Sequence, residues 1–171
     1  RSVVLDLQTE EGRARFAKLA ARADVMLEAF RPGVAKRLGI VPEAGKPDVV
    51  FLSISGFGQT GPYAERPCTD SVGQAFSGLA AMNEGMDGAP HRTGPIMTVD
   101  VVTGISAFAA VQAALAAQAR DRAAGAPPRP RVLDVSLMQS AAAFLALNIA
   151  ENGLLGQVPP APNVPAGTYQ C

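Results

Sequence analysis

Along the chain, segments with short continuous runs of apolar residues alternate with segments in which apolar residues recur at helical spacing. In the first sixty positions, three short apolar or β-branched runs predict strands, at residues 2–7, 24–30 and 47–58. Residues 9–24 between the first two have helical spacing, with Thr9 as a predicted N-cap and acids in the first turn. A turn and short helix over residues 31–40 follow the second strand. This alternation is typical of an open α/β sheet with right-handed crossovers.

The second half of the chain continues the alternation. It predicts helices and one more strand, over residues 71–82 (helix), 101–124 (helix), 131–137 (strand) and 139–155 (helix). The expected fold class is therefore α/β, an open, mostly parallel Rossmann-like sheet with flanking helices. The helix over 101–124 has no polar face in its first four turns, so we expect it to be central and buried. Its apolar side chains are Val101, Val102, Ile105, Phe108, Val111 and Leu115.

Composition narrows the function classes. The chain has 171 residues, of which 48% are hydrophobic, and its formal net charge is zero. No basic run stands out, so neither nucleic acid nor an anionic membrane is an expected partner. Gly, Asp or Gln interrupts the longest apolar stretches before the roughly 18 residues of a membrane span. A single histidine makes a histidine-based metal centre implausible, and no metal is expected.

The cysteines and the chain ends carry two further expectations. Cys68 and Cys171 lie far apart without metal-ligand spacing, which predicts free thiols in a reducing compartment and a cytoplasmic protein. The sequence opens on Arg1 directly before a strand-like run, and it stops within a Pro-rich stretch. We therefore expect a piece of a longer protein.

Several candidate sites have a plain structural interpretation. Residues 55–61, "SGFGQTG", lack the spacing of dinucleotide and P-loop motifs and predict a turn-rich loop, at the strand end where open α/β sheets bind ligands. His91 lies in a Gly/Pro loop and is expected to be solvated. Cys68 has no base near it in sequence, which favours a bystander over a nucleophile. Asp134 suits an N-cap or a turn carboxylate.

Two arginines and one aspartate leave the choice open. Arg31 and Arg37 flank the short helix over 31–40, where they either bind an anionic ligand or face water. Asp100 is the single charged residue between Pro95 and Leu115, at the start of the long apolar helix. Aspartate is a preferred N-cap, but a carboxylate held at a buried helix N-terminus also suits a nucleophile. The pattern alone allows either role.

Five blocks of the sequence resemble one family, in order and over nearly the whole chain. They are "SVVLDLQTEEGRARFAKLAARADVMLEAFRPGVAKRLGI", "FLSISGFGQTGPYAERPCTD", "GQAFSGLAAMNEG", "TVDVVTGISAFAAVQAAL" and "RVLDVSLMQSAAAF". The chain resembles the class III CoA-transferases, a group that includes formyl-CoA transferase, carnitine CoA-transferase and α-methylacyl-CoA racemase. Members of that group are about twice this length or more, which supports the expectation of a fragment.

The resemblance implies that Asp100 is the catalytic nucleophile, which attacks an acyl-CoA and passes through an anhydride and an aspartyl-CoA thioester. It implies coenzyme A as the substrate-borne cofactor, an acyl-CoA and a carboxylic acid as substrates, and an interlocked homodimer. Residues 1–124 would form the CoA-binding core, and 125–171 a strand–helix continuation that begins a linker towards a missing second domain. The implied CoA-binding residues are Leu5, Asp6, Leu7, Gln8, Phe30, Arg31, Arg37, Pro67, Cys68, Thr69 and Asp70.

Two departures from the family pattern affect function. Many relatives have Asn where this chain has Ala29, so a polar contact to CoA would be absent. The racemase branch has His at the position of Thr69, and without it two-sided proton transfer lacks a partner. A transferase is therefore favoured. The alternatives are an α-methylacyl-CoA racemase or epimerase, and a non-catalytic CoA-binding fragment.

Overall fold

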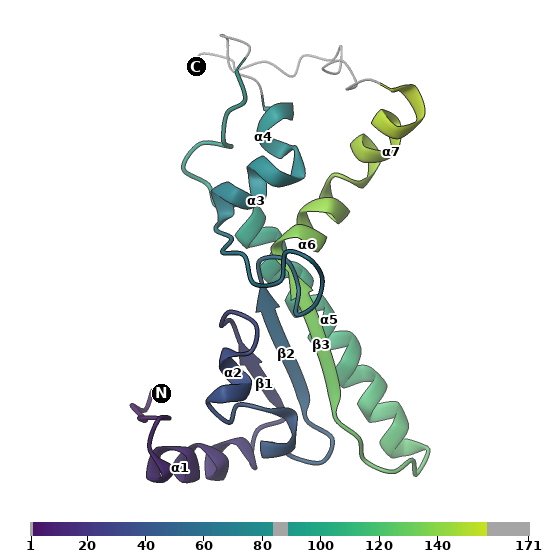
Figure 1. The fold of residues 1–171 in the computed structure, drawn as a ribbon. Coiled ribbons are helices and arrows are strands. Elements are labelled where there is room, and N and C mark those ends of the chain that lie inside the picture. The colour runs from purple at the N-terminus through teal and green to yellow at the C-terminus, as the bar shows by residue number, and fades with distance from the viewer. Residues whose placement is uncertain (1, 84–88, 157–171) are drawn as a thin grey trace, which may run out of the picture.

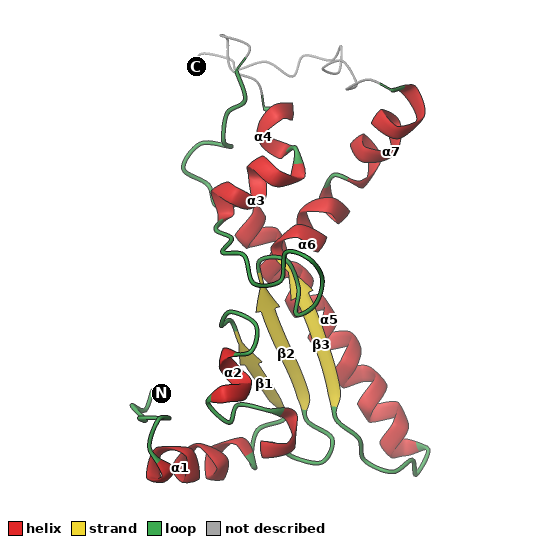
Figure 2. Cartoon of the chain, viewed as in Figure 1, coloured by secondary structure: helices red, strands yellow, loops and turns green. Residues whose placement is uncertain are grey.

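A three-stranded parallel sheet forms the centre of the computed structural model, which describes residues 2–83 and 89–156 (Figures 1 and 2). The order of the strands is β1-β2-β3, with β1 at Val25–Glu28, β2 at Val50–Ser55 and β3 at Arg131–Ser136. Val50 in the central strand pairs with Val25 on one side and with Arg131 on the other. The predicted α/β class and these three strands are confirmed.

Residues 2–7, in contrast, do not form the predicted strand. Val4 is 97% exposed, and the segment pairs with none of the described strands. Its end turns back on the next helix instead, because the carbonyl of Asp6 accepts hydrogen bonds from the backbone and hydroxyl of Thr9 (3.2 and 2.8 Å). A β-branched run becomes a strand only where a neighbouring strand completes its hydrogen bonds.

The helices in the amino-terminal part of the chain follow the predictions closely. Helix α1 spans Glu10–Ala20, and the hydroxyl of Thr9 accepts from the backbone N–H of Gly12 (3.1 Å), so the predicted N-cap is confirmed. Helix α2 spans Val34–Arg37 and is followed by a 3-10 turn, η1, at Pro42–Ala44. Ala20 of α1 packs with Met26, Val49 and Phe51, which joins this helix to β1 and β2.

Two predicted helices are each divided into two. The first divides into α3 (Asp70–Ser77) and α4 (Leu79–Met82), separated by Gly78 with φ of 88°. Positive φ ends a helix at little cost only for glycine. The second divides into α6 (Leu137–Phe144) and α7 (Ala146–Leu155) at Leu145. Leu145 is buried in a cluster with Leu79, Val99, Leu137 and Ala141 beyond the carboxyl ends of the strands.

Helix α5 spans Thr98–Ala123 and packs along β2 and β3 (Figure 1). Its buried residues form one stripe, Val99, Thr103, Ala107, Ala114 and Gln118. The expectation that its larger apolar residues are buried is wrong for Val101, Ile105 and Phe108, which is 66% exposed. Small residues face the sheet because they allow close approach, and the large ones lie on the opposite side.

By length and composition alone, α5 is long and apolar enough to cross a membrane, although Gly, Asp and Gln interrupt its apolar run. A core helix of a soluble protein meets the same criterion, so this carries no conclusion about a membrane. In the part of the chain that the structure describes, no other helix meets it.

The close approach of β2 to the loop before α3 depends on Gly56. A Cβ at Gly56 would lie 2.3 Å from the Cβ of Cys68, well inside van der Waals contact. We therefore expect Gly56→Ala to lower the free energy of unfolding by about 1–3 kcal/mol, because the loop must move. Urea unfolding followed by circular dichroism measures this change.

The matched control is Gly104→Ala on α5, where nothing lies within 4 Å of the new Cβ. Alanine favours a helix interior over glycine, so this variant should gain up to about 1 kcal/mol. Equal effects of the two substitutions would contradict the steric argument.

Candidate active site

A cleft of about 580 Å³ opens at the carboxyl ends of the three strands. Open α/β sheets bind their ligands at this edge. Residues that end or follow each strand contribute to the cleft, together with α3, the loop before α5 and the first turn of α5. The lining residues are Ala29, Ile54, Ser55, Gly56, Cys68, Thr69, Asp70, Ser71, Arg92, Gly94, Pro95, Ile96, Met97, Asp100 and Leu137. Four of the residues predicted for the site, Cys68, Thr69, Asp70 and Asp100, thus come together here.

Asp100 is the third residue of α5 and does not cap it. The N-cap position belongs to Met97, so the interpretation of Asp100 as an N-cap is wrong. The expectation that this carboxylate lies at a buried helix N-terminus is also wrong for Asp100 itself, which is exposed at the edge of the cleft. Partial burial, and then the negative charge of Asp70, raise the pKa of Asp100 above its ordinary value.

Asp70, from a different helix, supplies the cap. Its Oδ1 accepts hydrogen bonds from the backbone N–H groups of Val99 (2.8 Å) and Asp100 (3.1 Å). These donors belong to the first turn of α5, which has no partner for them within its own helix. Asp70 is buried, and a buried carboxylate is stable only where such donors surround it. The interaction fixes the start of α5 against α3.

Gln74 connects this cap to the loop before α5. Its side chain is fully buried, and its Nε2 donates to Oδ2 of Asp70 (2.5 Å). Its Oε1 accepts from the backbone N–H of Thr93 (2.9 Å) and from the Thr93 hydroxyl (3.3 Å). The Thr93 hydroxyl in turn lies 2.6 Å from the hydroxyl of Thr98, the first residue of α5. One buried amide therefore orients both Asp70 and the approach to α5.

Cys68 and Thr69 line the cleft beside the two carboxylates. Burial, Asp100 and Asp70 all raise the pKa of the Cys68 thiol, which keeps it protonated and a poor nucleophile. Its Sγ donates to the carbonyl of Thr69 at 3.6 Å. The geometry agrees with the bystander interpretation of Cys68. Pro67, also predicted for the site, is exposed and is not among the lining residues.

The predicted residues Leu5, Asp6, Leu7 and Gln8 lie at the amino end of α1. Asp6 Oδ1 accepts from the backbone N–H of Gln8 (2.9 Å). The guanidinium of Arg13 donates to the carbonyls of Leu7 (3.2 Å) and Gln8 (3.0 Å). The Cδ of Arg13 also lies 3.5 Å from the position that a Cβ of Gly39 would take. Arg13 therefore lies beside Gly39, two residues after the end of α2 at Arg37.

The turn after β1 carries Phe30 and Arg31, and it is held by an acid that the sequence analysis did not single out. Glu28 is buried at the end of β1, and its Oε2 accepts from the backbone N–H of Phe30 (2.8 Å). The one sequence signal for Glu28 was an acidic residue within an otherwise apolar run. Phe30 lines a separate hollow with Glu28, whereas Ala29 faces the cleft. Arg31 is exposed, as is Arg37.

Asp134 and His91 have structural surroundings. Asp134 Oδ2 accepts from the backbone N–H of Gln59 (2.9 Å), which confirms a turn carboxylate that holds the 55–61 loop. The alternative N-cap role falls to Ser136, whose hydroxyl accepts from Gln139 N–H (3.1 Å). His91 is exposed, as predicted for a loop residue, and its backbone N–H donates to the carbonyls of Ala80 and Asn83.

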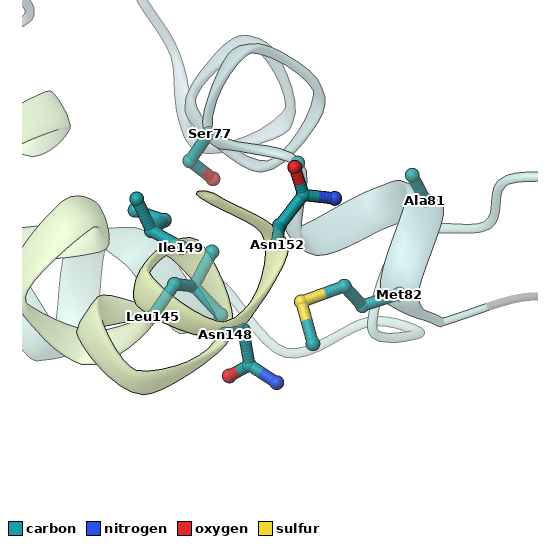
Figure 3. A pocket seen from close by; sticks show the side chains of 8 residues that line it. Ser77, Ala81, Met82, Leu145, Asn148, Ile149 and Asn152 are labelled. Atoms are coloured by element: carbon teal, nitrogen blue, oxygen red, sulfur yellow. The ribbon is translucent and has the colours of Figure 1, made fainter. Parts of the chain in front are cut away.

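A second pocket, of about 220 Å³, lies between α3–α4 and α7 (Figure 3). Asn148 and Asn152 of α7 line it opposite Ser77 and Met82. Among the described residues, no ionisable side chain lines this pocket, so they offer no acid, base or charged nucleophile there. Among residues 2–83 and 89–156, no group of three or more His, Cys, Asp or Glu side chains could hold a metal ion. The expectation of no metal stays a prediction.

Exchange of the polar groups between residues 70 and 74 tests the cap. In Asp70→Asn, the amide nitrogen would face the Gln74 amide, two donors without an acceptor between them. In Gln74→Glu, two carboxylates would be buried against each other. Each single variant should lose about 1–3 kcal/mol of unfolding free energy. The double variant restores every donor–acceptor pair, so we expect it to recover more than half of the summed loss.

Chemical denaturation of all four proteins gives the coupling energy directly. Additive losses in the double variant would show that residues 70 and 74 do not act as one hydrogen-bonded unit.

Comparison with known proteins identifies the family of the chain. The model of CoA-transferase family III matches residues 1–171. Over 147 residues the chain is 40% identical to acetyl-CoA:oxalate CoA-transferase of Acetobacter aceti, covering 84% of this chain and 36% of the relative. It is 32% identical over 160 residues to succinyl-CoA:glutarate CoA-transferase of Mus musculus, covering 92% of this chain and 35% of the relative.

A crystal structure of a CAIB/BAIF family protein from Brucella suis has the same fold, with a TM-score of 0.83 and 32% identity. The match covers 93% of this chain and 41% of that one, so this chain spans only about two fifths of the length of its relatives, or less. The family match over the whole chain, the sequence identity and the shared fold lead to one conclusion. The chain belongs to CoA-transferase family III.

Proposed function

We propose that the whole protein transfers coenzyme A from an acyl-CoA to a carboxylic acid, with Asp100 as the nucleophile. The observation that carries the proposal is the place of Asp100, in the first turn of α5 and within the cleft at the carboxyl ends of the strands. Membership of CoA-transferase family III supports the reaction class. The relatives named above act with oxalate and glutarate. A dicarboxylic acid is therefore the substrate class that we propose.

The reaction runs through two kinds of covalent intermediate on Asp100. Its carboxylate attacks the thioester carbonyl, CoA thiolate leaves, and a mixed anhydride forms. The thiolate then attacks the aspartyl carbonyl, which gives an aspartyl-CoA thioester and releases the donor acid as its carboxylate. The acceptor carboxylate attacks this thioester to form a new anhydride and thiolate. Attack of the thiolate on the acceptor's acyl carbonyl yields the new acyl-CoA and regenerates Asp100.

The surroundings of Asp100 suit this chemistry. A raised pKa makes a carboxylate more basic, and hence a better nucleophile once it is ionised. The helix N-terminus partly offsets the repulsion between Asp100 and Asp70, because its N–H groups favour nearby negative charge. Asp100 can therefore be anionic at neutral pH and still reactive.

CoA binding is proposed for the segment before α1, the turn after β1, the end of α2 and the loop that leads into α3. The residues are Leu5, Asp6, Leu7, Gln8, Phe30, Arg31, Arg37, Pro67, Cys68, Thr69 and Asp70. Arg37 would contact a CoA phosphate. The interlocked homodimer and the cytoplasmic location also remain proposals.

The racemase alternative is less favoured. Two-sided proton transfer at an α-carbon needs a second group that can exchange a proton near neutral pH. Thr69 does not provide one, and no histidine lines the described cleft. The non-catalytic alternative would bind CoA and form no adduct on Asp100.

Substitution of Asp100 separates these functions. Asp100→Asn should abolish turnover, because a neutral amide cannot form the anhydride. Both Asp100→Asn and Asp100→Ala should change the unfolding free energy by less than about 0.5 kcal/mol, since Asp70 provides the cap. Mass spectrometry of the whole protein with an acyl-CoA and hydroxylamine should locate a modified Asp100 only in the wild type. Near wild-type turnover by Asp100→Asn would exclude the mechanism.

The pH dependence has a defined sign. Since the pKa of Asp100 is raised, its carboxylate gains a proton at a higher pH than an ordinary aspartate. Adduct formation should therefore fall as the pH drops, with a midpoint above 3.8, the ordinary value. Single-turnover rates from pH 3.5 to 8 with an acyl-CoA measure this midpoint. A midpoint at or below the ordinary aspartate value would contradict the role of burial and Asp70.

Arg37→Ala tests the phosphate contact. It should weaken CoA binding by roughly 1–3 kcal/mol and make it less dependent on salt, as expected for a charge-assisted contact. Arg22→Ala, an exposed arginine outside the proposed site, is the control. Equal dissociation constants for wild type and Arg37→Ala in calorimetry would remove Arg37 from the site.

A further inference from the structure

Arg92 is the one basic side chain among the residues that line the described cleft. The two acids of the lining, Asp70 and Asp100, share that space with it. A carboxylic acid substrate enters as an anion. A cation in the cleft would stabilise a substrate carboxylate that binds there without reacting.

The contacts that the described residues make with Arg92 hold it in place without neutralising its charge. Its Nη1 donates to the hydroxyl of Ser71 (3.0 Å), a neutral partner. Its carbonyl accepts from Nδ2 of Asn83 (2.9 Å), and the next residue, Thr93, is bonded to the buried Gln74. No ion pair within residues 2–83 and 89–156 includes Arg92. A guanidinium has five N–H donors, so one contact to Ser71 leaves donors for a ligand.

Arg92 does not serve as the counter-ion of Asp100. A guanidinium against that carboxylate would lower its pKa, whereas burial and Asp70 raise it. Asp70 is likewise occupied, by two backbone N–H groups and by Gln74. Both Arg92 and Asp100 line the cleft, and no ion pair joins them within the described residues.

We propose that Arg92, anchored by Ser71, binds the non-reacting carboxylate of a dicarboxylic acid whose other carboxylate exchanges CoA at Asp100. This inference rests on the proposed function and assigns substrate selection to a residue outside the reaction itself. Recognition is electrostatic and directional, because a guanidinium presents paired donors to the two oxygens of a carboxylate. A neutral amide in place of that carboxylate would leave the charge of Arg92 uncompensated, and so would bind less well.

The experiment compares each dicarboxylic acid with its own monoamide as CoA acceptor in the whole protein. Oxalate, malonate, succinate and glutarate are tested first, and the best acid is carried forward. Wild type should prefer this acid over its monoamide. In Arg92→Gln the KM for the diacid should rise about 10- to 100-fold, while that for the monoamide changes less than about twofold. Arg92→Lys keeps the charge, so its KM for the diacid should lie between those of the wild type and Arg92→Gln.

Arg22→Gln is the matched control, because it removes the same charge from an exposed site. Arg22 lies between α1 and the start of β1, and it does not line the cleft. It should leave both KM values unchanged. An unchanged diacid preference in Arg92→Gln, or an equal rise for diacid and monoamide, would overturn the assignment of Arg92. So would a wild type that does not prefer the diacid. Failure of the proposed function looks different, since then the wild type would form no hydroxylamine-sensitive adduct with any acyl-CoA.

Discussion

The candidate site depends on the hydrogen bonds between the carboxylate of Asp70 and the first turn of α5. This carboxylate accepts two backbone N–H groups from α5 and one side-chain donor from its own helix. The first turn of any helix leaves such N–H groups without partners, and a buried helix start must find them elsewhere. Here they are found on α3, so the same contact that completes α5 also fixes the wall of the cleft. Gln74 extends that control to the loop carrying Arg92 and Thr93.

This arrangement places two carboxylates close together and gives them different tasks. Asp70 is buried and bonded on both oxygens, so its charge is stabilised by the protein. Asp100 is next to it in space but exposed at the cleft, and the charge of Asp70 contributes to its raised pKa. One acid thus holds the structure while the other stays available to a substrate. Pairs of acids separated in this way by their surroundings are a common source of division between structural and chemical roles.

The sequence predicted the elements better than their partners. The strands at β1, β2 and β3 and the Thr9 cap depend on local pattern, and the structure confirms them. The cap of α5 could not be read from local spacing, because its acceptor lies 30 residues earlier, on another helix. The same limit explains residues 2–7, whose pattern suits a strand but does not supply a neighbour.

The sequence was also a poor guide to which side chains are buried, as α5 shows. An apolar helix pattern does not say which side faces the sheet, and the sheet selects Thr103, Ala107 and Ala114 for their size. The sequence analysis did not predict that the polar residues Gln74 and Glu28 are buried. Their burial depends on hydrogen-bond partners that only the fold supplies. The predicted linker within 125–171 falls partly outside the described residues, and the domain division stays a prediction.

The chemistry of the cleft walls, as well as the position of Asp100, supports its proposed role as the nucleophile. Gly56 brings the end of β2 against Cys68, and Gly73 brings α3 against Val99 of α5, so these walls are closely packed. Burial and the charges of Asp100 and Asp70 raise the pKa of Cys68 and keep the thiol protonated, while Arg92 is a cation and Asp70 is already bonded. Among the described lining residues, Asp100 remains the one acidic group whose carboxylate no hydrogen bond occupies and which lies open to a substrate. Asp100 is therefore the acidic lining residue that best fits the proposed role of covalent acyl carrier.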